Sequence, residues 1–409
     1  MRRLLLALLI LAPRAGAAQT ISQRGFVDAT LTSFPQDARN DSVNNVGDLL
    51  LREEVFVKPA PWVQFAAGAD VRANTHDQID ARWRVDLADR EVLRPALSIR
   101  RLSATLHRGR FTLDAGRQFI RWGKTDIVTP TDRFAPRDFL NVIDTEFLPV
   151  TGARAGVRLG AGSLDVVWVP VFTPSRIPLL DQRWTVTPPG AASFVSIRQA
   201  DADLPGGSQT GVRWSQVGSR LEYAFAFFNG FHHLPNIEPL PQTRPDELIV
   251  VSRYPSLRSY GGDAAIPTPW LTLKVEAAYF TSDTPRTDEY VLYVAQVERQ
   301  SGEWSFIGGY AGDHVTNRRA ALPFAPDRGL TRALVGRASY TIDVNRSVAF
   351  ETAVRQNGEG GYAKAEYSQA YAQHWRATVS GSLVRGEPGD FIGQYRLNSH
   401  LTLGLRYSF

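Results

Sequence analysis

Residues 117–147 concentrate ionisable side chains in a stretch that has the length of one long loop. Five basic and five acidic residues are interspersed with aromatic residues such as Trp122 and Phe134. Opposite charges that face each other across a water-filled passage create a transverse field, which selects solutes by charge. A salt-bridged plug or an extracellular cap would use the same residues without a selective role. We predict a constriction formed by Arg117, Arg121, Lys124, Asp126, Asp132, Arg133, Arg137 and Asp138.

Patterns of histidine, serine and glycine do not indicate catalysis. None of the seven histidines has a metal-binding spacing such as H-E-x-x-H, and none is followed two residues later by serine. The adjacent His232 and His233 are expected to be solvated loop residues. The sequence contains no G-x-x-x-x-G-K-[ST] loop, and Asn357-Gly358 is typical of a turn. We therefore predict no catalytic residue, no metal and no cofactor.

Alternation of apolar and polar residues predicts the strands that position these side chains. In 271–279, for example, Leu273 and Val275 point one way, and Lys274 and Glu276 point the other. Segments of roughly ten residues have the length that a tilted strand needs to cross a bilayer. Such alternation occupies 27–31, 49–57, 63–71, 102–106, 111–115, 153–159, 164–168, 221–227, 271–279, 291–297, 304–311, 334–342, 348–354, 363–367, 375–383 and 400–409.

The final segment has a further feature. Leu401, Leu403 and Leu405 share one face with Tyr407 and Phe409, so the chain ends on an aromatic residue with another two positions earlier. This is the pattern of bacterial outer-membrane barrels, whose last strand closes the barrel and is read by the assembly machinery. We predict that Tyr407 and Phe409 form such an assembly signal.

The amino-terminal residues predict export from the cytoplasm. A short basic segment precedes an apolar run, 4–12, that is too short to span a bilayer, and Ala15-Gly16-Ala17 offers a cleavage site. We expect a signal peptide at 1–18 and a mature chain at 19–409.

Unequal links between the strands support a membrane barrel. Short links such as 343–345 contrast with the long segments 35–47, 173–207, 230–255 and 315–329. Outer-membrane barrels have short periplasmic turns and long extracellular loops. We predict an all-β, closed antiparallel transmembrane β-barrel of about sixteen strands (range 14–18) at 19–409, in which 117–147 is a candidate inward-folded segment. A secreted β-sandwich, solenoid or propeller is the alternative; no fixed repeat favours the last two, and aromatic residues near strand ends favour the barrel.

Composition excludes several classes of protein. The formal charge of +5 falls to +2 once Arg2, Arg3 and Arg14 leave with the signal peptide, which is too balanced to indicate nucleic-acid binding. The absence of cysteine excludes a disulfide framework.

The predicted strand registers direct more basic than acidic side chains toward the lumen, which would favour anions. Pairing with acids across strands would weaken that preference, and a register error of one residue would move a side chain to the other face. The predicted lumen charges include Arg52, Arg154, Arg158, Arg213 and Glu276.

One stretch resembles a known family. Gly116-Arg117-Gln118, Trp122-Gly123, Asp126 and Pro136-Arg137-Asp138 resemble the GRQ–WG–D–NP-RD segment of a large group of Gram-negative outer-membrane proteins of unassigned function. Residues 168–170, 174–178 and 276–280 fit as well, so the resemblance covers 26–409, although Ala135 stands where the family usually has Asn. It implies a porin-like barrel. Because members are often encoded beside RND-type exporters, it also implies export across the envelope, without assigning a substrate.

These observations leave three hypotheses open for a protein of the bacterial outer membrane. The first is a porin-like diffusion channel with mild anion preference, which is not an enzyme. The second is the outer-membrane component of an RND-linked export pathway for lipids, hydrophobic compounds or polysaccharide. The third is a non-conducting structural or adhesive barrel. The expected partners are outer-membrane lipid and lipopolysaccharide, the barrel-assembly machinery and, for the second hypothesis, a periplasmic or inner-membrane exporter. Cargo, gating, transport direction and oligomeric state do not follow from the sequence.

Overall fold

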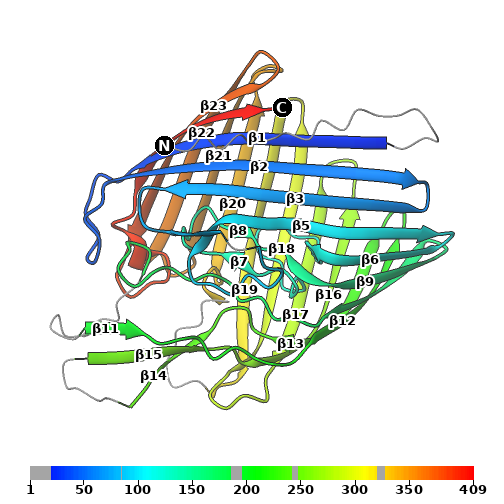
Figure 1. Cartoon of the computed structure of the whole chain (residues 1–409), viewed down its shortest axis with the longest axis horizontal. Helices are drawn as coiled ribbons and strands as arrows, with labels where there is room; N and C mark the ends of the chain where they lie inside the picture. The colour runs from blue at the N-terminus through cyan, green and yellow to red at the C-terminus, as the bar shows by residue number, and fades with distance from the viewer. Residues whose placement is uncertain (1–19, 84, 186–195, 242–246, 320–327) are drawn as a thin grey trace.

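The computed structural model describes residues 20–83, 85–185, 196–241, 247–319 and 328–409. The predicted signal peptide, 1–18, lies outside the described residues. Within them the chain forms a closed antiparallel barrel of 18 strands (Figure 1). The barrel strands are β1 (Thr20–Ser33), β2 (Asn45–Ala60), β3 (Val63–Asn74), β5 (Arg94–Arg108), β6 (Phe111–Gln118), β9 (Val150–Leu159), β10 (Gly162–Val169), β12 (Gln209–Val217), β13 (Glu222–Phe231), β16 (Ser256–Pro267), β17 (Thr272–Thr281), β18 (Glu289–Ser301), β19 (Trp304–Asn317), β20 (Ala333–Thr341), β21 (Arg346–Arg355), β22 (Gly360–Tyr371), β23 (Trp375–Gly386) and β24 (His400–Ser408).

The first and last strands close the barrel. β1 pairs with β24 from Phe26 opposite Ser408 to Ser33 opposite Leu401. Beyond this ladder the N–H of Phe409 donates to the carbonyl of Gly25 over 3.0 Å, and the N–H of Gly25 donates back over 3.1 Å. Closure satisfies the backbone groups that an open sheet edge would leave bare, which a strand in lipid requires.

The two faces of the wall differ in polarity, as the alternation predicts. On β24, Leu401, Leu403 and Leu405 are each 44–47% exposed on the outer face, whereas His400 is buried on the inner face. Leucine on the outer face of β1 and β2 continues this apolar band. An apolar outer band around a polar interior is the arrangement that lets a barrel sit in lipid.

The expected number of about sixteen strands is wrong, although 18 lies at the upper limit of the predicted range. The two strands outside the predicted segments are β12 and β16. On β12 only Val212 and Trp214 are large apolar residues on the outer face. β16 carries Gly261-Gly262 at its centre, and glycine weakens a strand pattern because it offers no side chain to pack.

The barrel has two unlike ends. At the turn end, links of a few residues join the strands, as at 109–110 between β5 and β6 and at 302–303 between β18 and β19. At the loop end, longer segments include β4 (Ile79–Trp83), which adds to β5, and a small sheet of β11 (Ser196–Gln199), β15 (Glu247–Arg253) and β14 (Asn236–Pro239). Figure 1 shows this small sheet beyond the barrel wall.

The core lies inside the barrel. The segment 119–149, which links β6 to β9 and is called the inward segment below, packs Ile120, Trp122 and Phe134 against apolar side chains of the inner wall. Those wall residues come mainly from β10, β13 and β16 to β18, and include Val167, Val169, Phe228, Leu257, Phe280 and Leu292. Within the inward segment, β7 (Arg137–Asp138) pairs with β8 (Glu146–Phe147). No described helix has the length and apolar character to cross a membrane.

Candidate functional site

Glu276 on β17 fixes the inward segment to the barrel wall. Its side chain is 2% exposed and faces inward. The Oε1 atom accepts hydrogen bonds from the N–H and hydroxyl of Thr131, both over 2.8 Å. The Oε2 atom accepts from the N–H of Lys124 (2.9 Å) and from the N–H and hydroxyl of Thr125 (3.1 and 2.9 Å). Five donors around one carboxylate compensate for its burial and clamp both sides of a tight loop.

Small residues let the inward segment approach the wall this closely. Gly123 has φ of +95°, and a Cβ there would lie 2.7 Å from Oε1 of Glu276. On β16, a Cβ at Gly261 would lie 2.8 Å from the Thr131 side chain. The absence of a side chain at both positions therefore makes the Glu276 clamp possible.

Beside this clamp, Lys124 and Asp126 form ion pairs with the wall. The Lys124 ammonium pairs with Glu222 on β13. Asp126 accepts from Lys274 Nζ over 3.1 Å and from Gln296 Nε2 over 2.7 Å. Burial raises the pKa of Asp126. Side-chain hydrogen bonds and the positive charge of Lys274 outweigh this effect and hold the pKa below its usual range. Both predicted residues are thus held by opposite charges or polar groups of the wall.

A second group gathers around the aromatic ring of Phe147. The guanidinium carbon of Arg121 lies 3.6 Å from the ring centroid, and that of Arg137 lies 4.1 Å away. Arg121 also donates to Asp132 over 2.9 Å, and 45% of its side chain is exposed. We call Arg121, Arg133 and Arg137 the arginine cluster, because Arg121 and Arg133 each lower the pKa of Arg137.

The arginine cluster places three guanidinium groups near one carboxylate, that of Asp132. Burial is the largest influence on Arg137 and lowers its pKa to about 10; Asp132 opposes this effect, and Arg121 and Arg133 add to it. Burial raises the pKa of Asp132 in spite of its bond to Arg121. The positive charges of Arg121 and Arg133 add to the lowering of the Arg137 pKa, so the cluster has a local positive potential that an anion would relieve.

The second half of the inward segment reaches the opposite side of the lumen. Glu146 binds Arg72 of β3 over 2.5 Å and lies 3.6 Å from Arg52 of β2. Asp144 accepts from Lys364 of β22 over 2.5 Å. The segment therefore extends from the wall at β17 to the walls at β2, β3 and β22, which narrows the lumen.

Asp138 links this half to the loops. Arg94 donates two bonds to its carboxylate, over 2.8 and 3.0 Å, and Arg176 adds a third over 3.3 Å. Burial alone would raise the pKa of Asp138, but the two guanidiniums outweigh it and lower the pKa to about 2.

Arg117 lies apart from the other predicted constriction residues. It ends β6, is 1% exposed, and donates to the carbonyls of Ile99 and Leu87, both over 2.7 Å. Its guanidinium lies 3.3 Å from Asp89, which pairs with Arg176 as well. Arg117 thus holds the loop between β3 and β5.

His233 connects three loops and is not the solvated residue that we expected. It is partly buried, with Nδ1 2.7 Å from the carbonyl oxygen of Thr173 and Nε2 3.0 Å from that of Arg133. Burial lowers its pKa to about 4. An adjacent pair of histidines in a polar stretch carries no local signal for this role.

Most of the basic residues that were predicted to face the lumen form ion pairs with acidic residues on neighbouring strands. Arg52 binds Asp70 (2.7 Å), Arg154 binds Asp165 (2.9 Å) and Arg213 binds Asp263 (2.6 Å). Arg158 is exposed near the turn end of β9. These pairs reduce the positive potential of the wall, so the arginine cluster is the stronger candidate for charge selection.

Sequence reasoning missed several partners. Asp70, Asp89, Arg94 and Lys364 bind the inward segment or its supports, although nothing in their local sequence distinguishes them from other polar inward residues. Arg176 lies in 174–178, which the family resemblance had already singled out.

Comparison with known proteins identifies the fold. No protein-family model matches the chain, and no curated protein matches its sequence. OccAB1 of Acinetobacter baumannii superposes with a TM-score of 0.55 at 9% identity, over 96% of this chain and 96% of that chain. The outer membrane protein OpdK of Pseudomonas aeruginosa gives 0.54 at 9% identity, over 95% and 98%. A BenF-like porin from Pseudomonas fluorescens Pf-5 gives 0.53 at 10% identity, over 96% and 98%. The chain therefore has a porin-like outer-membrane β-barrel fold.

Proposed function

We propose that this protein is a channel of the bacterial outer membrane, through which small solutes diffuse with a preference for anions. The observation that carries the proposal is the inward segment, which crosses the polar lumen and narrows it. The porin-like fold and the apolar outer band support the location.

The passage lies on the side of the lumen away from the Glu276 clamp. The wall at β10, β13 and β16 to β18 is covered by the inward segment. The inner faces of β20 to β23 carry polar side chains, among them Arg337, Glu351, Glu366 and Arg376, and turn apolar only where Ala353 and Val384 pack near Ile143 and Ile392. A water-filled route follows the polar wall, because apolar surfaces exclude hydrated ions.

The proposed anion preference rests on the arginine cluster. The Arg121 side chain is 45% exposed, and the guanidinium groups of Arg121 and Arg137 both lie against the Phe147 ring. A unit charge about 7 Å from an ion in water interacts with it by roughly 0.6 kcal/mol, which is close to RT. Each arginine attracts the anion and repels the cation by this energy, so each should change the anion-to-cation permeability ratio about sevenfold.

Planar-bilayer recordings test both parts of the proposal. The purified protein should conduct, and its reversal potential in a salt gradient should indicate anion preference. Arg121→Gln combined with Arg137→Gln should lower the permeability ratio by up to about fiftyfold, two factors of about seven. Arg346→Gln is the matched control, because Arg346 is exposed at the turn end and pairs only locally with Asp343. An unchanged reversal potential in the double variant would reject the cluster as the filter.

The two alternatives predict a different result in the same recordings. An export component that opens only with an RND-type partner, or a structural or adhesive barrel, should give no conductance when purified alone. A silent bilayer would therefore overturn the channel proposal. Contacts with lipopolysaccharide and with the barrel-assembly machinery remain part of the proposal for any of the three functions.

A further inference from the structure

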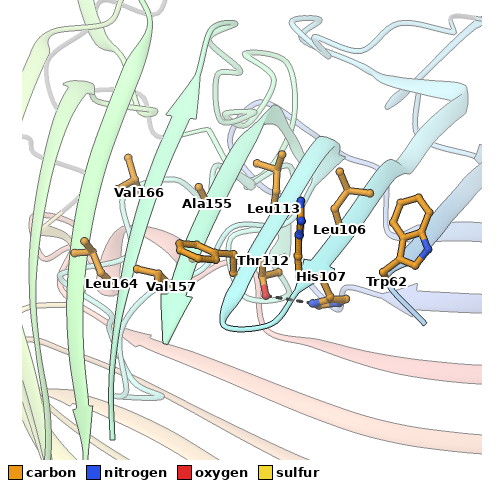
Figure 2. Close-up of a pocket in the computed structure, with 12 residues that line it drawn as sticks. Trp62, Leu106, His107, Thr112, Leu113, Ala155, Val157, Leu164 and Val166 are labelled. Carbon is orange, nitrogen blue, oxygen red and sulfur yellow. Dashed lines mark hydrogen bonds between the residues drawn. The ribbon is translucent and has the colours of Figure 1, made fainter. Parts of the chain in front are cut away.

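A deep groove runs along the outer, lipid-facing wall near the turn end of β5, β6, β9 and β10 (Figure 2). Its volume is about 870 Å³, within the range of about 300–1,000 Å³ typical of small-molecule sites. Its side walls are apolar, with Leu106 and Leu113 on one side and Leu164 and Val166 on the other.

The strand register explains why this part of the wall is hollow. Ala155 lies directly opposite Leu113 on β6 and directly opposite Val166 on β10. All three side chains point outward, and the methyl group of Ala155 is the smallest of them. The short alanine therefore forms the floor between two larger apolar residues.

The turn-end mouth of the groove is positively charged. Arg108 lies on the outer face opposite Phe111, and the guanidinium of Arg110 lies 5.3 Å from the Phe111 ring centroid. Both arginines are exposed, and neither forms an ion pair with another described residue. Trp62, 60% exposed, lies beside the same mouth, where the indole ring suits a membrane interface.

We propose that this groove binds one anionic phospholipid from the periplasmic leaflet. Short turns are periplasmic in outer-membrane barrels, so the mouth meets the headgroup layer of that leaflet. Arg108 and Arg110 contact the phosphate, and an acyl chain lies over Ala155 between Leu113 and Val166. Guanidinium groups suit phosphate oxygens because they present several donors in one plane.

The charge at the mouth favours this occupant over a second copy of the chain. In a two-fold interface the same patch meets itself, so Arg108 and Arg110 would face their own copies across an apolar contact. Like charges brought together there would oppose association. A phosphate at the same place is attracted by both guanidiniums.

Native mass spectrometry of the full mature barrel in detergent, titrated with phosphatidylglycerol or phosphatidylcholine, tests the proposal. The unaltered protein should retain one phosphatidylglycerol, and retain it more strongly than phosphatidylcholine. Arg108→Gln with Arg110→Gln should weaken phosphatidylglycerol binding about tenfold and remove the preference. Ala155→Leu should fill the floor and weaken the binding of both lipids.

Matched controls separate this site from general contact with detergent and lipid. Arg299→Gln removes an exposed outward arginine near the turn end of β18, and Ala365→Leu enlarges an outward alanine on β22. Neither should change lipid retention. Equal loss in the control and groove variants, or equal retention of both lipids by the unaltered protein, would overturn the proposal. So would a groove variant that changes the oligomeric mass without changing lipid binding, because it would identify an interface between copies. Heat-modified electrophoretic mobility of each variant verifies that its barrel is folded.

Discussion

Replacement of Glu276 by glutamine should release the inward segment while leaving the barrel closed. The carboxylate accepts five hydrogen bonds, two at Oε1 and three at Oε2. A glutamine amide keeps one acceptor oxygen and presents an NH₂ group at the other position. With the NH₂ group at the Oε1 position, the Thr131 N–H faces a donor while the Thr131 hydroxyl turns to accept; with the NH₂ group at the Oε2 position, the N–H groups of Lys124 and Thr125 face a donor. At least one backbone donor of the segment therefore loses its acceptor.

The size of the effect follows from that count. A hydrogen bond to a charged group contributes about 1.5–3 kcal/mol, so loss of at least one such bond removes about 1.5–3 kcal/mol or more from the attachment of 123–131. A loss of that size raises the population of the detached segment by about tenfold to a hundredfold. The apolar contacts of Ile120, Trp122 and Phe134 are unchanged, so we expect transient detachment rather than permanent disorder.

Two measurements detect this detachment in the Glu276→Gln protein. In single-channel recordings we expect a larger mean conductance and more current noise, because a detached segment no longer narrows the lumen in one position. In limited trypsin digestion we expect faster cleavage after Lys124, whose backbone N–H is bound to Glu276 in the unaltered protein.

Glu366→Gln is the matched control for charge, because Glu366 faces the lumen from β22 and forms no hydrogen bond with the described inward segment. The control should leave both the cleavage rate and the current noise unchanged. If Glu276→Gln matches the unaltered protein in conductance and in cleavage, the clamp does not position the segment and the reasoning fails.

Three further predictions concern Gly123, Asp138 and Phe409. Gly123→Ala should reproduce the trypsin sensitivity of Glu276→Gln, since its Cβ would lie 2.7 Å from the carboxylate and φ is +95°; unchanged digestion would contradict the steric argument. The pKa of Asp138 is about 2 in the folded protein, below its usual value of about 3.9, so its pairs with Arg94 and Arg176 are complete above about pH 4 and are lost as the pH falls through about 2. Hydrogen exchange in 137–147 should rise over that interval, and the Asp138→Asn variant should show fast exchange already at pH 6. Deletion of Phe409 should reduce the yield of heat-modifiable barrel in cells, whereas Val344→Ala at an exposed turn should not; equal yields would argue against an assembly signal.

Much of the barrel follows from sequence because its two environments are so different. Lipid outside and water inside require alternation, and β24 displays it without interruption. The exceptions are strands whose inner face packs against the inward segment and does not face water. β16 has Gly261 where the inward segment lies against the wall, so its pattern is weakened by a tertiary contact that no local rule anticipates.

The sequence predicted a candidate site at 117–147, but it did not predict the partners of the residues there. The charges of 117–147 do meet partners across the lumen, yet Arg117 supports a loop and Lys124 pairs with Glu222 on the wall. Such distinctions depend on partners outside the local sequence, 18 to 30 residues away for Arg117 and 98 residues away for Lys124. Glu276 was predicted only as a lumen charge, because its five donors come from a loop whose path the sequence does not specify.

A barrel strand with apolar residues on both its inner and its outer face indicates where the inward segment lies against the wall. In 290–295 of β18 and 223–228 of β13, apolar residues occupy inner as well as outer positions. If Phe228 or Leu292 on the inner wall were in contact with water, the protein would lose the free energy of burying that side chain, about 1.5–3 kcal/mol for each residue. Something apolar must therefore cover those strands, and Ile120, Trp122 and Phe134 of the inward segment do so. Strands with a polar inner face, such as β22, need no cover, so the same pattern that marks where the segment docks also marks the wall along which solutes pass.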